Sequence, residues 1–223
     1  MTYTIAFILA YCSIVYELVL AQSLSAFLGD TVLRYSTTIG LYLASMGIGA
    51  FLCRGRLLRD PAYSLVKIEI LLAVIGGFAV VYLYLLDILS PFVSIFFILS
   101  HLLIITIGIL TGFEIPLLIE IRRQEKEGDL NAVLGITYIG ALSGTIIFPI
   151  LLLPTVGVLT IAFLTGSLNA VGGLLLLFKK NTETRRKFLF LMLANFTVGV
   201  ILLACVLFSR TIGTYFMEKY LSG

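Results

Sequence analysis

The stretch IAFILAYCSIVYELVLAQSLSAFL, residues 5–28, decides the fold, because it is apolar over about two dozen residues and carries one carboxylate, Glu17. An α-helix rises about 1.5 Å per residue, so about 20 apolar residues cross the hydrocarbon of a bilayer. We therefore expect a membrane-spanning helix here. The run lacks a basic leader and is too long for the apolar part of a cleaved signal peptide.

The rest of the chain has the same character. Of its 223 residues, 60% are hydrophobic and 12% are charged, and the mean hydropathy is +1.13. A soluble domain of this length needs more charge to cover its surface. The fold class predicted is therefore all-α, a polytopic membrane helix bundle. Seven apolar runs are predicted to cross the bilayer: Tyr3–Leu28, Val32–Cys53, Leu65–Asp87, Pro91–Ile119, Leu130–Leu153, Val156–Phe178 and Phe188–Phe208.

The basic residues predict how these runs are oriented. Of the 15 Lys and Arg residues, 12 follow the second, fourth and sixth runs, which seven spans place on one side of the membrane. The positive-inside rule then predicts that the N-terminus and the basic loops are cytoplasmic and the C-terminus external. The run 130–153 contains Pro149 and several glycines, so it is where we expect an irregular helix.

Small residues at helical spacing predict where helices approach each other closely. Packing inside the bundle is preferred here over dimerisation through the GxxxG pair. The faces expected to make these contacts are Gly40, Ala44 and Gly47, with Ser45 and Gly49 beside them, then Gly140 and Gly144, and Gly166, Ala170 and Gly173.

Ionisable residues within the apolar runs are the candidates for function, because burying one in a bilayer costs at least about 2.5–3.5 kcal/mol. Glu17 is expected near mid-membrane, with His101, the single histidine, as a conceivable partner. Glu114 precedes Pro116, whose missing N–H is expected to bend the helix and free a carbonyl near Gly112. These depths indicate two separate carboxylate sites.

Each of these residues also has a purely structural interpretation. Glu17, Glu114 and His101 can serve as hydrogen-bonding groups between helices, and Pro116 can simply bend its helix. Asp30 and Arg34 are most simply a helix cap and its interfacial partner. Glu69 lies barely one turn into the third run and is expected to reach the cytoplasmic interface. The ligand or proton candidates are Glu17, Glu114, His101, Tyr16, Asp30, Arg34 and Pro116.

Several kinds of chemistry have no sequence support. The chain has no GxGxxG after a strand and no HExxH, GxSxG or Walker motif. Its three cysteines have neither CxxC nor Cys/His spacing, so we expect no metal site and no disulfide framework. We expect no cofactor, no nucleic-acid partner and no catalytic residues in this chain, which is not by its own residues a complete enzyme.

Several stretches together resemble the membrane domain of multi-pass spermidine-synthase-like proteins, the polyamine aminopropyltransferase family. The resemblance covers nearly the whole chain. One departure is Thr137, where the family usually has an acidic residue. The stretches that carry the resemblance are Val15–Leu18, Leu28–Leu33, Ile39–Leu41, Ala44–Gly49, Gly112–Leu118, Tyr138–Gly144 and Phe148–Pro149.

In that family a soluble Rossmann-like domain transfers aminopropyl groups from decarboxylated S-adenosylmethionine to a diamine. The resemblance therefore implies a transmembrane helical domain over 1–210 and a linker stub over 211–223, in either a truncated chain or a stand-alone module. It also implies a prokaryotic inner membrane and a synthase domain or subunit as partner. An external C-terminus conflicts with a cytosolic S-adenosyl substrate, unless one run does not cross.

Two functions remain open from the sequence. The first is a non-catalytic membrane domain that anchors a synthase module and binds or passes polyamines through its carboxylates. The alternative is a stand-alone small-molecule transporter, proton-coupled through Glu17 and His101. The first predicts stabilisation by polyamines, and the second predicts flux across a liposome membrane.

Overall fold

The computed structural model describes residues 2–89, 92–124, 130–178 and 185–222, with the side chains of 130, 177–178, 185–188, 217 and 220–222 left aside. Every element in this described part is helical, which confirms the all-α prediction. The elements are α1 (Thr2–Leu28), α2 (Thr31–Leu52), α3 (Arg56–Arg59), α4 (Pro61–Gly77), α5 (Ala79–Leu89), α6 (Val93–Gly112), α7 (Glu114–Gln124), α8 (Leu130–Ile147), the π-helical η1 (Phe148–Leu152), α9 (Leu153–Phe178), α10 (Arg185–Leu207) and α11 (Ser209–Ser222).

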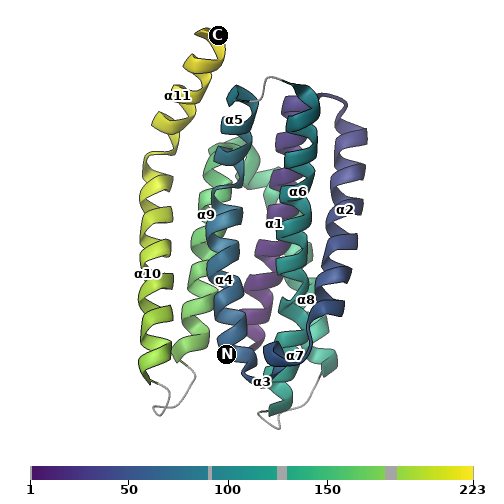
Figure 1. The fold of residues 1–223 in the computed structure, drawn as a ribbon, viewed down its shortest axis with the longest axis vertical. Helices are drawn as coiled ribbons and strands as arrows, with labels where there is room; N and C mark the ends of the chain where they lie inside the picture. The colour runs from purple at the N-terminus through teal and green to yellow at the C-terminus, as the bar shows by residue number, and fades with distance from the viewer. Residues whose placement is uncertain (1, 90–91, 125–129, 179–184, 223) are drawn as a thin grey trace.

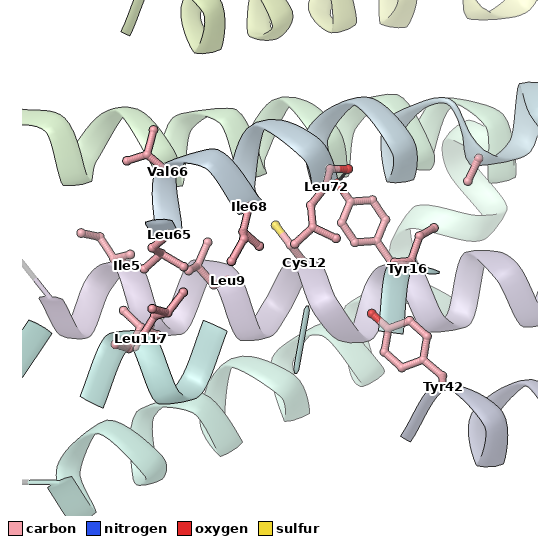
Figure 2. Close-up of a cluster of buried hydrophobic side chains, with 14 of the residues drawn as sticks. Ile5, Leu9, Cys12, Tyr16, Tyr42, Leu65, Val66, Ile68, Leu72 and Leu117 are labelled. Carbon is pink, nitrogen blue, oxygen red and sulfur yellow. Dashed lines mark hydrogen bonds between the residues drawn. The ribbon is translucent and has the colours of Figure 1, made fainter. Parts of the chain in front are cut away.

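Helix α1 lies at the centre of the bundle, and the other long helices run beside it (Figure 1). It packs against α2, α8 and α9, and also contacts α5, α6 and α7. A helix that is covered on all sides needs no polar face, which is why residues 5–28 are apolar nearly all round. Figure 2 shows this packing, with Ile5, Leu9 and Cys12 of α1 lying against Leu65, Ile68 and Leu72 of α4.

Several helices are apolar enough to cross a membrane, but the predicted number of spans is not established. Five segments among the described residues have the length and composition of a span, or six if α4 and α5, bent by 44°, count as one. The segment Asn131–Leu176 counts once although it has 46 residues. At about 1.5 Å per residue it would be far longer than a bilayer is thick. In the structure it reverses direction, because α8 and α9 both reach the same end of the bundle (Figure 1).

The reversal lies where the sequence predicted an irregular helix. Residues Phe148–Leu152, which include Pro149, form a π-helical segment between α8 and α9. Gly157 follows with a φ of 77° and a ψ of 162°, a backbone conformation that residues with a Cβ rarely adopt. A π segment and a positive-φ glycine together let the chain turn back without an extended loop.

The two ends of the bundle differ in charge. The N-terminus, α3 and the end of α7 lie at one end of the long axis, and the C-terminus lies at the other (Figure 1). The first end therefore carries Arg54, Arg56, Arg59 and the end of α7 with Arg122 and Arg123. Described members of two of the three predicted basic groups thus lie at one end of the bundle, and the third group, at 179–187, falls outside the residues and side chains that the structure describes. The termini lie at opposite ends (Figure 1).

Close helix contacts occur at most of the predicted glycines. Gly140 and Gly144 of α8 lie against the backbone of α1 at Phe7 and Tyr11, so the GxxxG pair packs inside the bundle as expected. Gly166 of α9 lies against Ala73 and Gly77 of α4. Of the two faces predicted for α2, the one with Ser45 and Gly49 is confirmed, and the one with Gly40 and Gly47 was wrong, because the partner α6 covers only the first. Gly40 and Gly47 have open space around them, whereas Ser45 and Gly49 contact α6 at Gly108, Ile109 and Gly112.

The proposed linker 211–223 is helical wherever the structure describes it. Helix α11 begins at Ser209, so the boundary drawn at residue 210 falls inside one helix. The side chain of Phe216 stacks on Tyr84 of α5 at 5.0 Å between ring centroids. The hydroxyl of Thr160 in α9 lies 3.0 Å from that of Ser209, so α11 is held against the bundle.

Candidate functional site

A cavity of about 210 Å³ lies between α1, α2, the α6–α7 junction and α8. Its walls are mainly apolar, but two carboxylates line it, Glu17 of α1 and Glu114 of α7. The expectation of two separate carboxylate sites was therefore wrong. Depth along each helix was a poor guide, because helices packed side by side can bring such residues to one cavity.

Both carboxylates are buried. Glu17 and Glu114 are each 4% exposed. Oε1 of Glu114 has no hydrogen-bond partner in the described structure. Leu43 and Tyr138, 56% and 73% exposed, line the same cavity and bring it to the surface of the bundle between α2 and α8.

The helix break at Pro116 positions Glu114. Helix α6 ends at Gly112, and α7 begins at Glu114 after Phe113, as the sequence predicted for a proline at 116. Pro116 has no N–H to offer the carbonyl of Gly112, so the continuous helix is interrupted there. Gly112 itself lies against the backbone of Met46 in α2, where a Cβ would overlap the carbonyl oxygen. The break and the close contact together hold Glu114 at the cavity.

A third carboxylate, Glu69 of α4, lies next to this site. It is 0% exposed, and neither of its carboxylate oxygens has a hydrogen-bond partner in the described structure. Helix α4, which carries Glu69, packs against α7, which carries Glu114. The expectation that Glu69 reaches the cytoplasmic interface was wrong.

The helix boundary explains why Glu69 was misjudged. Hydropathy begins the third run at Leu65, but α4 begins at Pro61, with the side chain of Asp60 accepting the N–H of Tyr63. An aspartate cap followed by proline at the first helical position is a start signal that the sequence contained. With that start, Glu69 is the ninth residue of the helix and lies more than two turns inside it.

His101 is not placed at the cavity. Its Nδ1 lies 2.7 Å from the carbonyl oxygen of Phe97, one turn back on the same helix, and its ring packs on Phe97. Among the described residues no hydrogen bond or ion pair joins His101 to Glu17. The proposed proton coupling through this pair therefore has no contact to support it.

Tyr16 is adjacent to Glu17 in sequence but faces another helix. Its hydroxyl donates to the carbonyl oxygen of Leu72 at 3.1 Å, and its ring covers Gly76 of α4. Figure 2 shows Tyr16 on the α4 side of α1 and Tyr42, from α2, on the opposite side. Tyr16 is thus a packing residue between α1 and α4, and it does not line the cavity.

Asp30 and Arg34 lie at the far end of α2 from the basic loops. The side chain of Asp30 accepts the N–H of Leu33 at 3.2 Å, so the predicted helix cap is confirmed. The guanidinium of Arg34 lies over the ring of Phe97, 5.9 Å from its centroid. Neither residue lines the cavity.

Thr137, where the family resemblance leads one to expect an acidic residue, does line the cavity. Its hydroxyl donates to the carbonyl oxygen of Leu134 at 2.8 Å, within α8. The departure from the family pattern therefore falls beside Glu17 and Glu114. This position was noticed in the sequence, but only the fold shows that it belongs to the same cavity.

The other cavities described are less suited to a charged ligand. One of about 320 Å³ is lined by Gln22, Tyr84 and Phe216 among others, and one of about 340 Å³ lies between α9 and α10. Neither is lined by a carboxylate. Among the described residues no group of three His, Cys, Asp or Glu side chains could hold a metal ion.

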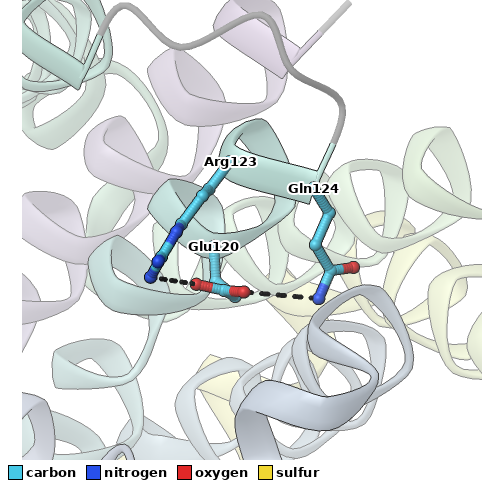
Figure 3. A network of polar contacts seen from close by, with 3 residues as sticks. All are labelled: Glu120, Arg123 and Gln124. Atoms are coloured by element: carbon cyan, nitrogen blue, oxygen red, sulfur yellow. Dashed lines mark hydrogen bonds and ion pairs between the residues drawn. The ribbon is translucent and has the colours of Figure 1, made fainter.

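Glu120 of α7 provides a contrast with Glu114 on the same helix. It accepts from Nε2 of Gln124 at 3.4 Å and pairs with Arg123 at 3.8 Å, at the end of the helix (Figure 3). An exposed pair of this kind contributes little to stability, typically below about 1 kcal/mol. Glu120 is therefore a matched control for substitutions of the cavity carboxylates.

The chain is similar to several proteins of one name. A Leptospira interrogans protein named polyamine aminopropyltransferase is 38% identical over 169 residues, which cover 75% of this chain and 33% of that protein. The Ralstonia nicotianae polyamine aminopropyltransferase 2 is 38% identical over 73% of this chain and 32% of its own length. An Oceanobacillus iheyensis polyamine aminopropyltransferase is 33% identical over 95% of this chain and 41% of its own length.

The extent of these matches limits what they establish. No family model matches the chain, and no solved structure matches it. The chain spans about a third of the length of the Leptospira interrogans and Ralstonia nicotianae relatives. It is thus a homologue, over that third of their length, of proteins named polyamine aminopropyltransferase.

Proposed function

We propose that this chain is the membrane-embedded helical part of a spermidine-synthase-like protein and that its central cavity binds the ammonium groups of a polyamine. The observation that carries the proposal is the presence of Glu17 and Glu114 in one cavity whose other walls are mainly apolar. The names of the relatives support the polyamine context.

The charge of the cavity favours a cationic ligand. A unit positive charge 4 Å from a carboxylate gains about 4 kcal/mol at an effective dielectric constant of about 20. No Lys, Arg or His side chain of the described residues forms an ion pair with Glu17 or Glu114. An ammonium group would supply the missing positive charge.

The shape of the cavity favours a slender chain. Its volume of about 210 Å³ is below the roughly 300–1,000 Å³ of pockets that bury drug-sized molecules. Polyamines alternate ammonium groups with short methylene segments. Leu9, Met46 and Leu118 in the walls would contact the methylenes, and the two carboxylates would contact the nitrogens.

We also propose that the bundle crosses a prokaryotic inner membrane seven times, with its N-terminus and basic end in the cytoplasm. The passes would be α1, α2, α4–α5, α6–α7, α8, α9 and α10, which all run along the long axis of the bundle (Figure 1). The gathering of basic residues at one end supports this orientation. A synthase module joined to α11 would then lie outside the cytoplasm, and the chain would act as its membrane anchor.

Polyamine binding is expected to raise the thermal stability of the purified protein in detergent. A ligand at 100 times its Kd stabilises the folded state by about 2.7 kcal/mol, or roughly 5–10 °C in Tm for a chain of this size. The chain has no Trp, but Cys12 and Cys53 are buried, so a thiol-reactive fluorophore reports unfolding. The probes are putrescine and spermidine, with 1,4-butanediol as the uncharged analogue of putrescine.

The variants in this experiment distinguish binding at the cavity carboxylates from a general effect of removing negative charge. Glu17→Gln and Glu114→Gln should each lose most of the Tm increase, and Glu120→Gln should keep it. Butanediol should have no effect on any of the proteins. The proposal of a polyamine site is wrong if the unsubstituted protein shows no increase, or if all three variants respond alike.

The proposed orientation predicts that a reporter fused after Gly223 is external. In a bacterial cell, alkaline phosphatase at this position should be active and a fluorescent protein that folds only in the cytoplasm should be dark. A fusion after Leu52, before the basic residues that follow α2, should give the reverse result. A cytoplasmic C-terminal reporter would contradict the seven-span arrangement.

A further inference from the structure

Glu69 lies in a polar pocket of the core that the cavity does not include. Helix α4 presents it toward α9 and α10, where Gly173 provides the necessary space: a Cβ built on Gly173 would lie 3.3 Å from Cβ of Glu69. The same Cβ would overlap Nδ2 of Asn195, so Glu69 and the Asn195 amide lie side by side at this glycine. Both side chains are fully buried.

Two buried amides on the helices that pack against α4 have unused hydrogen-bonding capacity. Nδ2 of Asn195 donates to the carbonyl oxygen of Ala170 at 3.0 Å, but its Oδ1 has no partner in the described structure. Asn169, one helical turn before Gly173 on α9, is 0% exposed and has no partner for either amide atom. Buried polar groups are nearly always hydrogen-bonded. These unpartnered atoms therefore indicate that the site needs a hydrogen-bond donor which an ionised Glu69 does not provide.

The groups that surround Glu69 carry negative charge or none. Of the helices packed on α4, α7 carries Glu114, and α1 carries Cys12 and Tyr16, which pack against Ile68 and Leu72 of α4. The only described charged side chains of α3 are Arg56 and Arg59, which are exposed, and Arg122 of α7 donates to the hydroxyl of Tyr3. The histidine of α6, His101, bonds within its own helix, and the polar groups considered above on α9 and α10 are amides. Among the described residues no cation pairs with Glu69.

A buried carboxylate with no cation is stable only when it takes up a proton, because water no longer solvates its charge. A second carboxylate close by strengthens this requirement, since two like charges in a dry site repel each other. A protonated Glu69 has an O–H that can donate to the unpartnered Oδ1 of Asn195, which an ionised carboxylate cannot do.

We propose that Glu69, with the Asn195 amide beside it, forms a proton-binding site inside the bundle. Both carboxyl groups of the Glu69–Glu114 pair are protonated in the empty bundle, and Glu114 is the member that can ionise toward the cavity. When the cavity takes up an ammonium group, Glu114 releases its proton to solvent and its carboxylate pairs with the cation, while Glu69 remains a carboxylic acid. This last step rests on the proposed polyamine site, but the protonation of Glu69 does not.

Infrared spectroscopy of the full chain in nanodiscs tests the proton site without any ligand. A protonated carboxyl group has a C=O stretching band separate from the bands of carboxylates and amides. At neutral pH the unsubstituted protein should show such a band, and Glu69→Gln should lose the part that belongs to one carboxyl group. Glutamine matches a neutral glutamic acid in shape, so this variant should keep the Tm of the unsubstituted protein. Glu120→Gln should leave the band unchanged.

A second variant, Asn195→Ala, provides an independent test of the proton site. If Glu69→Gln does not fold, Asn195→Ala takes its place: removing the amide acceptor should shift the frequency of the carboxyl band without removing it. An intact band in Glu69→Gln, or an unchanged band frequency in Asn195→Ala, would overturn the proposal. If polyamines do not stabilise the unsubstituted protein, the cavity proposal alone is wrong, because the carboxyl band of Glu69 does not depend on polyamine binding.

Discussion

Replacing Gly49 with alanine is expected to destabilise the bundle by about 3 kcal/mol, or roughly 6–12 °C in Tm. A Cβ at this position would overlap the carbonyl oxygen of Ile109 and lie 3.1 Å from Cα of Gly112. These are backbone atoms, so no side-chain rotation can relieve the overlap. Helices α2 and α6 would have to separate along the line where they are packed most closely. Thermal unfolding followed by circular dichroism at one fixed heating rate measures the change.

Gly47 is the matched control, because it lies on the same helix with nothing within 4 Å of its Cβ position. Gly47→Ala should keep or slightly raise the Tm, since alanine favours a helix over glycine by up to about 1 kcal/mol. Equal destabilisation by the two substitutions would show that α2 and α6 are not packed at Gly49 as described.

Replacing Tyr16 with alanine is expected to cost about 3–5 kcal/mol, the range found for large aromatic residues removed from protein cores. The side chain is 1% exposed and fills the space over Gly76 between α1 and α4. Tyr16→Phe should cost only about 1 kcal/mol, because it removes the hydrogen bond to Leu72 and keeps the ring. The two variants can be compared by the same unfolding experiment.

The Tyr16→Phe variant also tests whether Tyr16 binds a ligand or a proton. Because its hydroxyl faces α4 and not the cavity, Tyr16→Phe should keep the full Tm increase with spermidine. Tyr215→Ala, which removes a ring that is 59% exposed, should change the Tm little. A lost spermidine response in Tyr16→Phe would return Tyr16 to the candidate site.

Much of the architecture could be predicted from local patterns. The long apolar runs predicted where the major helices lie, apart from their ends and the bend between α4 and α5, since a helix that is surrounded by apolar groups must itself be apolar. Asp30 was recognised as a cap, and Pro116 as the cause of a helix break, because both effects act within a few residues of chain. The spacing of Gly140 and Gly144 predicted packing inside the bundle, and the structure identified α1 as the partner.

The candidate site could be predicted only in part, because it is made of residues from helices far apart in the sequence. Glu17 and Glu114 were identified, but their depths along separate helices did not show that they share a cavity. His101 was considered a conceivable partner of Glu17, but its ring contacts Phe97 on its own helix. Glu69 was set aside because an apolar run is a poor guide to where a helix begins. Its cap at Asp60 was the signal that could have corrected this.

The sequence by itself determined that the chain is helical, that its helices are long and apolar, and that its basic residues gather at alternate connections. These properties depend on the composition and spacing of neighbouring residues, which the linear chain contains. Only the tertiary structure decided which face of α2 meets α6, that Glu17 and Glu114 line one cavity, and that Glu69 lies beyond it beside Asn195. Those facts depend on how helices rotate and pair, and an apolar helix surrounded by apolar neighbours carries no pattern that reveals its rotation.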